Sequence, residues 1–239
     1  MKKATWIFFA ATLVACVAAP ALAQAEGPEG SVRVGGGWIA GEKDSSKLQQ
    51  YQVVPDGQVF FGVDLGWEFG NGLYLDGHAN QLFYDDEHAE VVFGRQNGFK
   101  VGMFYDRSPN WISNTARTYF QDLGGNVFVL DPAIRQVTAA RATANYAAIA
   151  AKAAPVDLRY VRRTTGAFAT FPIFEGFKFS AMYADESRSG HMPVAFVSAS
   201  SPGGNVTELP VAISYQTRNA TFGLEYAKDN LFVSAEAFV

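Results

Sequence analysis

The fold is decided by residues 89–126, AEVVFGRQNGFKVGMFYDRSPNWISNTARTYFQDLGGN. In the first half, apolar side chains occupy alternate positions on both sides of an Asn97-Gly98 pair, and the positions between them are mostly polar or glycine. A period of two indicates extended strands with two unlike faces, and Asn-Gly between two such strands predicts a tight hairpin. The second half, from Ser108 onward, is polar and aromatic without a period, and it predicts a long loop.

A cleaner alternation lies upstream of this hairpin. One parity of residues 59–68 is wholly apolar, with Val59, Phe61, Val63, Leu65 and Trp67. The other parity contains Asp64 and Glu68, and in the next strand, residues 73–83, the polar parity contains Asp76, His78 and Asn80. Similar alternation recurs at residues 31–39, 156–161, 177–183, 209–217, 220–227 and 231–239, which gives about ten strands.

One segment has a different character. Asp131 and Pro132 are a good N-cap and a good first helical residue, and the alanine-rich sequence after them continues until Pro155. Because its apolar positions form no stripe, we expect a loop helix and not a core helix.

The lengths of the connections indicate where the sheet lies. Long connections fall only at odd positions along the chain: residues 41–57, 108–154 and 187–208. One end of the sheet therefore carries loops and the other carries turns, as in outer-membrane β-barrels. Most strands have the nine to eleven residues that cross a bilayer when tilted. We expect an antiparallel transmembrane β-barrel wall with the long connections outside; a soluble β-sandwich is the alternative, since alternation alone does not identify the solvent.

The amino terminus predicts export. Lys2 and Lys3 precede an apolar run that ends in Ala21-Leu22-Ala23, which indicates a signal peptide over residues 1–23 and a mature chain over residues 24–239. Leu13-Val14-Ala15-Cys16 resembles a lipobox, so lipidation at Cys16 is the competing processing event.

Composition excludes several classes of function. Cys16 is the only cysteine, so a processed chain has no disulfide and no thiol nucleophile. The sequence has 19 basic and 23 acidic residues, and cleavage would remove two of the basic ones, which argues against a nucleic-acid partner. No Gly-x-Ser-x-Gly elbow or phosphate-binding glycine loop occurs, so we expect no enzyme activity.

Several segments, in this order, are similar to a known family: GEKDSSKLQQY (41–51), FYDRSPNWISNTART (104–118), LGG (123–125), VDLRYVRR (156–163), ELP (208–210) and GLEY (223–226). The chain resembles the amino-terminal portion of the MtrB/PioB family of decahaem-cytochrome-associated outer-membrane β-barrels. Family members are much longer, so the chain resembles a partial barrel wall. It also lacks the Cys-x-x-Cys that some members carry near the mature amino terminus.

The resemblance implies that the barrel is a sheath around a periplasmic decahaem c-type cytochrome, through which electrons cross the outer membrane. Outer-membrane lipid is then a second partner, and an extracellular cytochrome is a further candidate. The chain has no Cys-x-x-Cys-His motif, so haem would belong to the partner and the chain itself needs no cofactor. A general or substrate-specific porin is the alternative function, because a polar lumen is its signature too.

The candidate site is the polar parity of the strands. We expect its side chains to face the lumen or the partner: Asp64, Glu68, Asp76, His78, Asn80, Glu90, Lys100 and Arg159. The acidic turn Asp85-Asp86-Glu87 and the isolated histidines lack the spacing of calcium or zinc sites, so we expect no metal. Arg159, Arg162 and Arg163 either contact an acidic partner or lipopolysaccharide phosphates, or balance lumen carboxylates; the sequence leaves both open.

Overall fold

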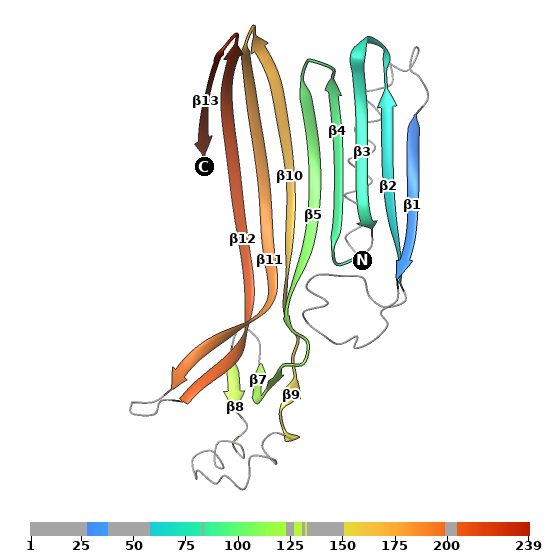
Figure 1. Ribbon diagram of the computed structural model, residues 1–239. Coiled ribbons are helices and arrows are strands. Elements are labelled where there is room, and N and C mark those ends of the chain that lie inside the picture. Colours follow the sequence, from blue (N-terminus) through green and yellow to red (C-terminus); the bar gives the residue numbers. More distant parts are fainter. Residues whose placement is uncertain are drawn as a thin grey trace.

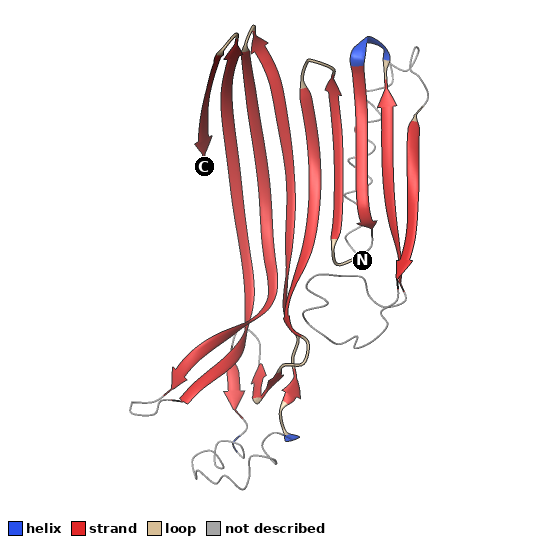
Figure 2. Cartoon of the chain, viewed as in Figure 1, coloured by secondary structure: helices blue, strands red, loops and turns tan. Residues whose placement is uncertain are grey.

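The computed structural model describes residues 28–37, 58–82, 84–122, 127–130, 132, 151–198 and 205–239. Within these ranges, nine strands form one antiparallel sheet in the order β1-β2-β3-β4-β5-β10-β11-β12-β13 (Figure 1). Their bounds are β1 Glu29–Gly37, β2 Gln58–Glu68, β3 Leu73–Leu82, β4 Glu87–Arg95, β5 Lys100–Ser113, β10 Leu158–Phe174, β11 Phe177–Ser198, β12 Asn205–Lys228 and β13 Leu231–Phe238. Strands dominate the described chain (Figure 2), so the prediction of an all-β antiparallel fold is confirmed.

The register of the ladder gives the sheet two unlike faces, because directly opposed residues project to the same side. One row across the first five strands contains Val32, Val63, Ala79, Ala89 and Tyr105. This row, and every second row from it along the strands, project to one side of the sheet, which we call the apolar face. The adjacent row contains Ser31, Asp64, His78, Glu90 and Phe104. It belongs to the opposite side, the polar face.

Among the described residues, no second layer covers the apolar face. Val32 is 69 % exposed and Met103 is 54 % exposed, and no described side chain is fully buried. A β-sandwich would cover this face with a second sheet, and the described residues include no second sheet of comparable size. A contiguous apolar surface of this extent indicates lipid as its solvent.

On the polar face, aromatic rings lie over glycines of the neighbouring strand. A Cβ atom added to Gly102 would lie 2.4 Å from the Phe168 ring, and one added to Gly166 would lie 2.3 Å from the Phe104 ring. Gly35 has the same relation to Phe60. These pairs explain why Phe104 breaks the polar parity of β5, because its ring lies along the sheet in the space that a side chain at Gly166 would need.

All described connections at one end of the sheet are tight turns, and the Asn97-Gly98 hairpin among them was predicted. The hairpin between β4 and β5 turns at Asn97, which has a φ of 57°, and Gly98 N–H donates to the Arg95 carbonyl at 2.9 Å. The 3₁₀ turn η2, Gly70–Gly72, joins β2 to β3, and Asp229 with a φ of 53° lies between β12 and β13.

The prediction of a loop at residues 187–208 is wrong for its described parts. β11 and β12 are 22 and 24 residues long, and they stay paired from Phe177↔Tyr226 to Ser198↔Asn205. The predicted break between residues 217 and 220 is also absent, because Arg218 pairs across the ladder with Asp185 at 3.2 Å. In the sequence, the polar residues around Arg218 interrupt the apolar alternation and were therefore interpreted as a break between two strands.

The expected loop at residues 108–154 begins later than predicted and contains strands. β5 continues to Ser113 and pairs with β10 throughout. Beyond it, β6 (Arg117–Thr118) pairs with β9 (Ala154–Pro155), and β7 (Phe120–Asp122) pairs with β8 (Phe128–Leu130).

Three predicted segments lie outside the described residues: the signal peptide with Cys16, the connection at residues 41–57, and most of the alanine-rich helix. Among the described residues, no helix has both the length and the apolar character needed to span a membrane.

Candidate functional site

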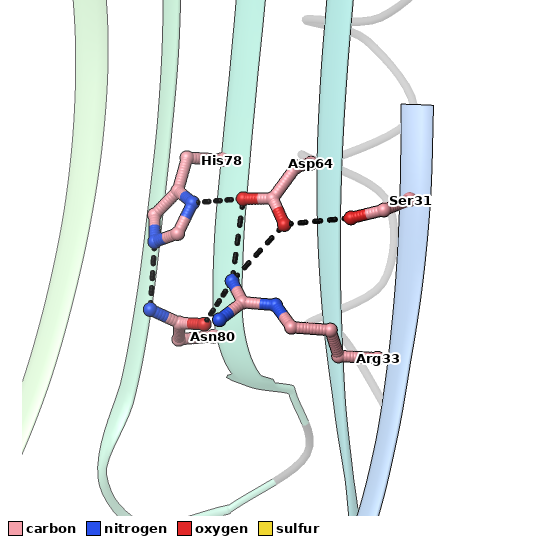
Figure 3. Close-up of polar contacts among 5 residues, drawn as sticks. All are labelled: Ser31, Arg33, Asp64, His78 and Asn80. Atoms are coloured by element: carbon pink, nitrogen blue, oxygen red, sulfur yellow. Dashed lines mark hydrogen bonds and ion pairs between the residues drawn. The ribbon is translucent and has the colours of Figure 1, made fainter. Parts of the chain in front are cut away.

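The most connected part of the polar face is a cluster around Asp64 on the first three strands. Ser31 on β1 and His78 on β3 lie directly opposite Asp64 in the register, so the alternation that separates the faces also brings these side chains together. Figure 3 shows Asp64 between them, with Arg33 and Asn80 beside it.

The contacts form a closed circuit. Arg33 Nη2 donates to Asp64 Oδ1 at 3.2 Å and to Asn80 Oδ1 at 3.0 Å, and Ser31 Oγ donates to Asp64 Oδ2 at 3.0 Å. His78 Nδ1 lies 2.5 Å from Asp64 Oδ1, and Asn80 Nδ2 lies 2.6 Å from His78 Nε2. Each of these contacts joins a donor to an acceptor if His78 is neutral with its proton on Nδ1, because Asn80 then donates to Nε2 while its own oxygen accepts from Arg33.

This circuit orders the side chains more than it stabilises the fold. The Asp64 and Arg33 side chains are 40 % and 53 % exposed, and exposed ion pairs contribute about 0–1 kcal/mol each. The arrangement holds charged and polar groups at fixed positions on a surface that remains exposed.

A second group continues the polar face across β4, β5 and β10. His88 Nδ1 lies 3.5 Å from Asp106, whose other oxygen lies 3.9 Å from Arg162. The His78 and His88 ring centroids are 6.1 Å apart, which links this group to the Asp64 circuit. A shallow hollow between the two groups is lined by Asp76, His78, His88 and Glu90.

Seven of the eight predicted site residues share the polar face. Asp64, His78 and Asn80 are in direct contact, Asp76 and Glu90 line the adjoining hollow, and Lys100 lies 5.5 Å from the centroid of the Phe168 ring on the same side. Glu68 is exposed at the turn end of β2.

Arg159 does not belong with them. It has the parity of the apolar face, where it lies over the Trp111 ring at 4.7 Å and pairs with Asp85 at 3.1 Å. Asp85 also pairs with Arg107. Residues of β10 alternate faces, so the cluster of basic residues in the sequence is divided: Arg162 lies on the polar face, and Arg159 and Arg163 lie on the other.

Sequence reasoning missed Ser31 and Arg33, although both occupy the polar parity of β1 and that parity is the signal that identifies them. It also missed the pairing of His88 with Asp106. Across the part of the chain that the structure describes, no three or more His, Cys, Asp or Glu side chains are arranged to hold a metal ion.

One burial effect lies outside the strands. Asp86 follows β3 in the connection to β4, where burial raises the pKa of its carboxyl group and the negative charge of Asp106 raises it further. Asp86 is therefore an unfavourable charge at neutral pH, in contrast to the paired Asp85.

Comparison with known proteins agrees with this architecture. A family model described as "Putative outer membrane beta-barrel porin, MtrB/PioB" matches residues 41–238, which is most of the chain. No curated protein matches the sequence. With one antiparallel sheet, an exposed apolar face and a polar opposite face, the chain belongs to the MtrB/PioB family of outer-membrane β-barrels.

Proposed function

We propose that the polar face lines a lumen that holds a periplasmic decahaem c-type cytochrome, so that the barrel is an insulating sheath for electron transfer across the outer membrane. The observation that carries the proposal is the division of the sheet into an exposed apolar face and a polar face of ordered, mixed-sign charge. A charged cytochrome is not stable in roughly 30 Å of hydrocarbon, and a wall with these two faces separates it from lipid.

The polar face suits a protein occupant held by many weak contacts. Its ion pairs connect neighbouring strands: Arg33–Asp64, Arg162–Asp106 and Lys178–Glu225. Because these charges are already paired in the wall, an occupant gains little from any one of them, and positioning depends on the whole surface.

In this proposal the chain supplies no catalytic residue and no cofactor. A c-type haem is attached through two cysteines, and the chain has only Cys16, so the haems belong to the cytochrome. We also propose export through the signal peptide and an orientation in which the long connections face outside and the short turns face the periplasm, as in other outer-membrane barrels.

The test is isolation of the full-length protein from outer membranes, followed by haem staining and reconstitution in liposomes with an enclosed electron acceptor. The proposal expects a haem-bearing partner in stoichiometric amount and electron transfer across the bilayer. A matched sample carries charge reversals at Asp64, Asp76 and Glu90 together, and it should lose partner while keeping a folded barrel.

The porin is the second candidate, favoured by the wording of the family description. A haem-free barrel that conducts small solutes through liposomes would reject the sheath and support the porin.

A further inference from the structure

The apolar face ends abruptly toward the long connections, and the register shows where. The last apolar row on the four strands beyond β4 contains Met103, Ala167, Tyr183 and Ala220. The next row on the same face contains Tyr105, Thr165, Asp185 and Arg218. The row after that contains Arg107, Arg163, Ser187 and Gln216. On each of the four strands, the change from hydrocarbon-compatible to polar side chains therefore occurs within two residues of the chain, from one row of this face to the next.

Most charges in these border rows have a partner in the protein. Arg107 pairs with Asp85 and donates to the Tyr84 carbonyl at 3.0 Å. Arg218 pairs with Asp185 at 3.2 Å, and Asp185 also accepts two bonds from Gln216 at 3.0 Å. The Arg218 side chain remains 64 % exposed.

Arg163 differs from these residues, because it has no ion pair or hydrogen bond with any described residue. Its neighbours across the ladder are Arg107, which has the same charge, and Ser187. The hydroxyl group of Tyr105, one row nearer the apolar band, is hydrogen-bonded to Glu87. Because Asp85 already balances Arg107, Arg163 is the cation of this row that has no ion pair among the described residues, and an anion from the surroundings would stabilise it.

We propose that Arg163, together with the exposed Arg218, binds the phosphate groups of lipid A in the outer leaflet. Guanidinium groups bind phosphate in a bidentate manner, and the two arginines are two strands apart, which is about 10 Å across the sheet. Lipid phosphates lie at the boundary between headgroups and hydrocarbon, and both arginines lie at the corresponding boundary of the protein. The assignment to lipid A rests on the proposed outward orientation of the long connections and is independent of what fills the lumen.

Arg162 provides a matched control on the same strand. It is the adjacent residue with the same charge, but it lies on the polar face and pairs with Asp106. Loss of Arg162 removes equal charge from the protein without removing a lipid contact.

The test uses the full chain isolated from outer membranes in mild detergent, with its fold verified by the shift of electrophoretic mobility on heating. Lipopolysaccharide, lipopolysaccharide with its lipid A phosphates removed, phosphatidylglycerol and inorganic phosphate are the probes, and bound lipid is measured by native mass spectrometry. Arg163→Gln should weaken binding of intact lipopolysaccharide about fivefold, and Arg218→Gln should weaken it in the same direction. Arg163→Lys keeps the charge but not the bidentate geometry, so it should weaken binding less than Arg163→Gln does. Arg162→Gln should leave lipopolysaccharide binding unchanged, and the dephosphorylated lipid should bind the wild type and Arg163→Gln alike.

Equal loss from Arg162→Gln and Arg163→Gln, or equal binding of intact and dephosphorylated lipid to the wild type, would overturn the proposal. Displacement of lipopolysaccharide by inorganic phosphate would instead identify a site for free anions, and equally tight binding of phosphatidylglycerol would identify a general anionic-lipid site. If Arg163→Gln does not fold, Arg163→Lys and Arg218→Gln still decide between these outcomes.

Discussion

Val63 and Asp76 lie on adjacent strands but on opposite faces of the sheet. An arginine substituted at each position in turn tests whether the two faces have different surroundings. Val63 lies in the apolar row between Val32 and Ala79, whereas Asp76 is exposed on the polar face. Arginine near the middle of a lipid-facing strand costs about 2–4 kcal/mol in folding. We expect Val63→Arg to lower the free energy of unfolding by about that amount and Asp76→Arg to change it by less than about 1 kcal/mol. Urea titration of the protein folded into lipid vesicles measures both; equal losses would show that the apolar face is not in lipid.

Asp86 provides a prediction about pH at the same scale. Its pKa is raised in the folded protein above the ordinary value of 3.8, so the carboxylate opposes folding above that raised pKa, and the opposition disappears as pH falls through it. We expect Asp86→Asn to be more stable than the wild type at neutral pH, and the difference to vanish in acid. Asp85→Asn is the control of opposite sign, because it loses the ion pairs to Arg107 and Arg159. Urea midpoints at stepwise lower pH test this; a difference that persists in acid would contradict it.

At the scale of the elements, the packing of β5 against β10 depends on glycines that accept aromatic rings. A Cβ atom at Gly166 would lie 2.3 Å from the Phe104 ring and 2.6 Å from the Tyr183 carbonyl oxygen, whereas at Gly66 the nearest atoms lie 3.9 Å away. Overpacking of this kind costs about 1–3 kcal/mol. Gly166→Ala should therefore lower the urea midpoint clearly and Gly66→Ala should not. The same loss at both glycines would mean that the effect comes from general strand propensity and not from the ring.

Sequence alternation predicted the strands well where one face is apolar for the whole crossing, as in β2 and β3. It failed where polar residues continue a strand beyond the apolar band. Arg163, Thr164 and Thr165 in β10 are polar on both parities, as are Arg218 and Asn219 in β12, yet each pairs with a neighbouring strand. Arg159 was assigned to the wrong face because Val156, Leu158 and Tyr160 form an apolar alternation around it in the sequence. In the structure Arg159 shares the parity of Val161 and Ala167, which belong to the apolar face. The Asp64 circuit needed the register between strands, which one sequence does not contain.

At the scale of the whole molecule, the strands are longer than a membrane requires. β12 has 24 residues, whereas a tilted crossing needs about 9–11. The surplus lies at the end with the long connections, beyond the row that contains Arg218. The hairpin of β11 and β12 therefore extends past the other main-sheet strands at one end of the sheet only (Figure 1). For a wall that spans the membrane, this predicts an asymmetric molecule.

This asymmetry has a direction that labelling can measure. In the proposed orientation, cysteines introduced at Ser45, Asn114 and Ser200 lie outside, and cysteines introduced at Asn71, Asn97 and Asp229 lie on the periplasmic side. Cys16 is replaced by alanine so that it does not contribute. On intact cells, an impermeant maleimide should label the first group and should label the second only after the outer membrane is permeabilised. The second group is the internal control, because its residues occupy tight turns of the same protein and become reactive under the same conditions. Labelling of the second group alone on intact cells would invert the topology, and it would move Arg163 and Arg218 to the periplasmic leaflet.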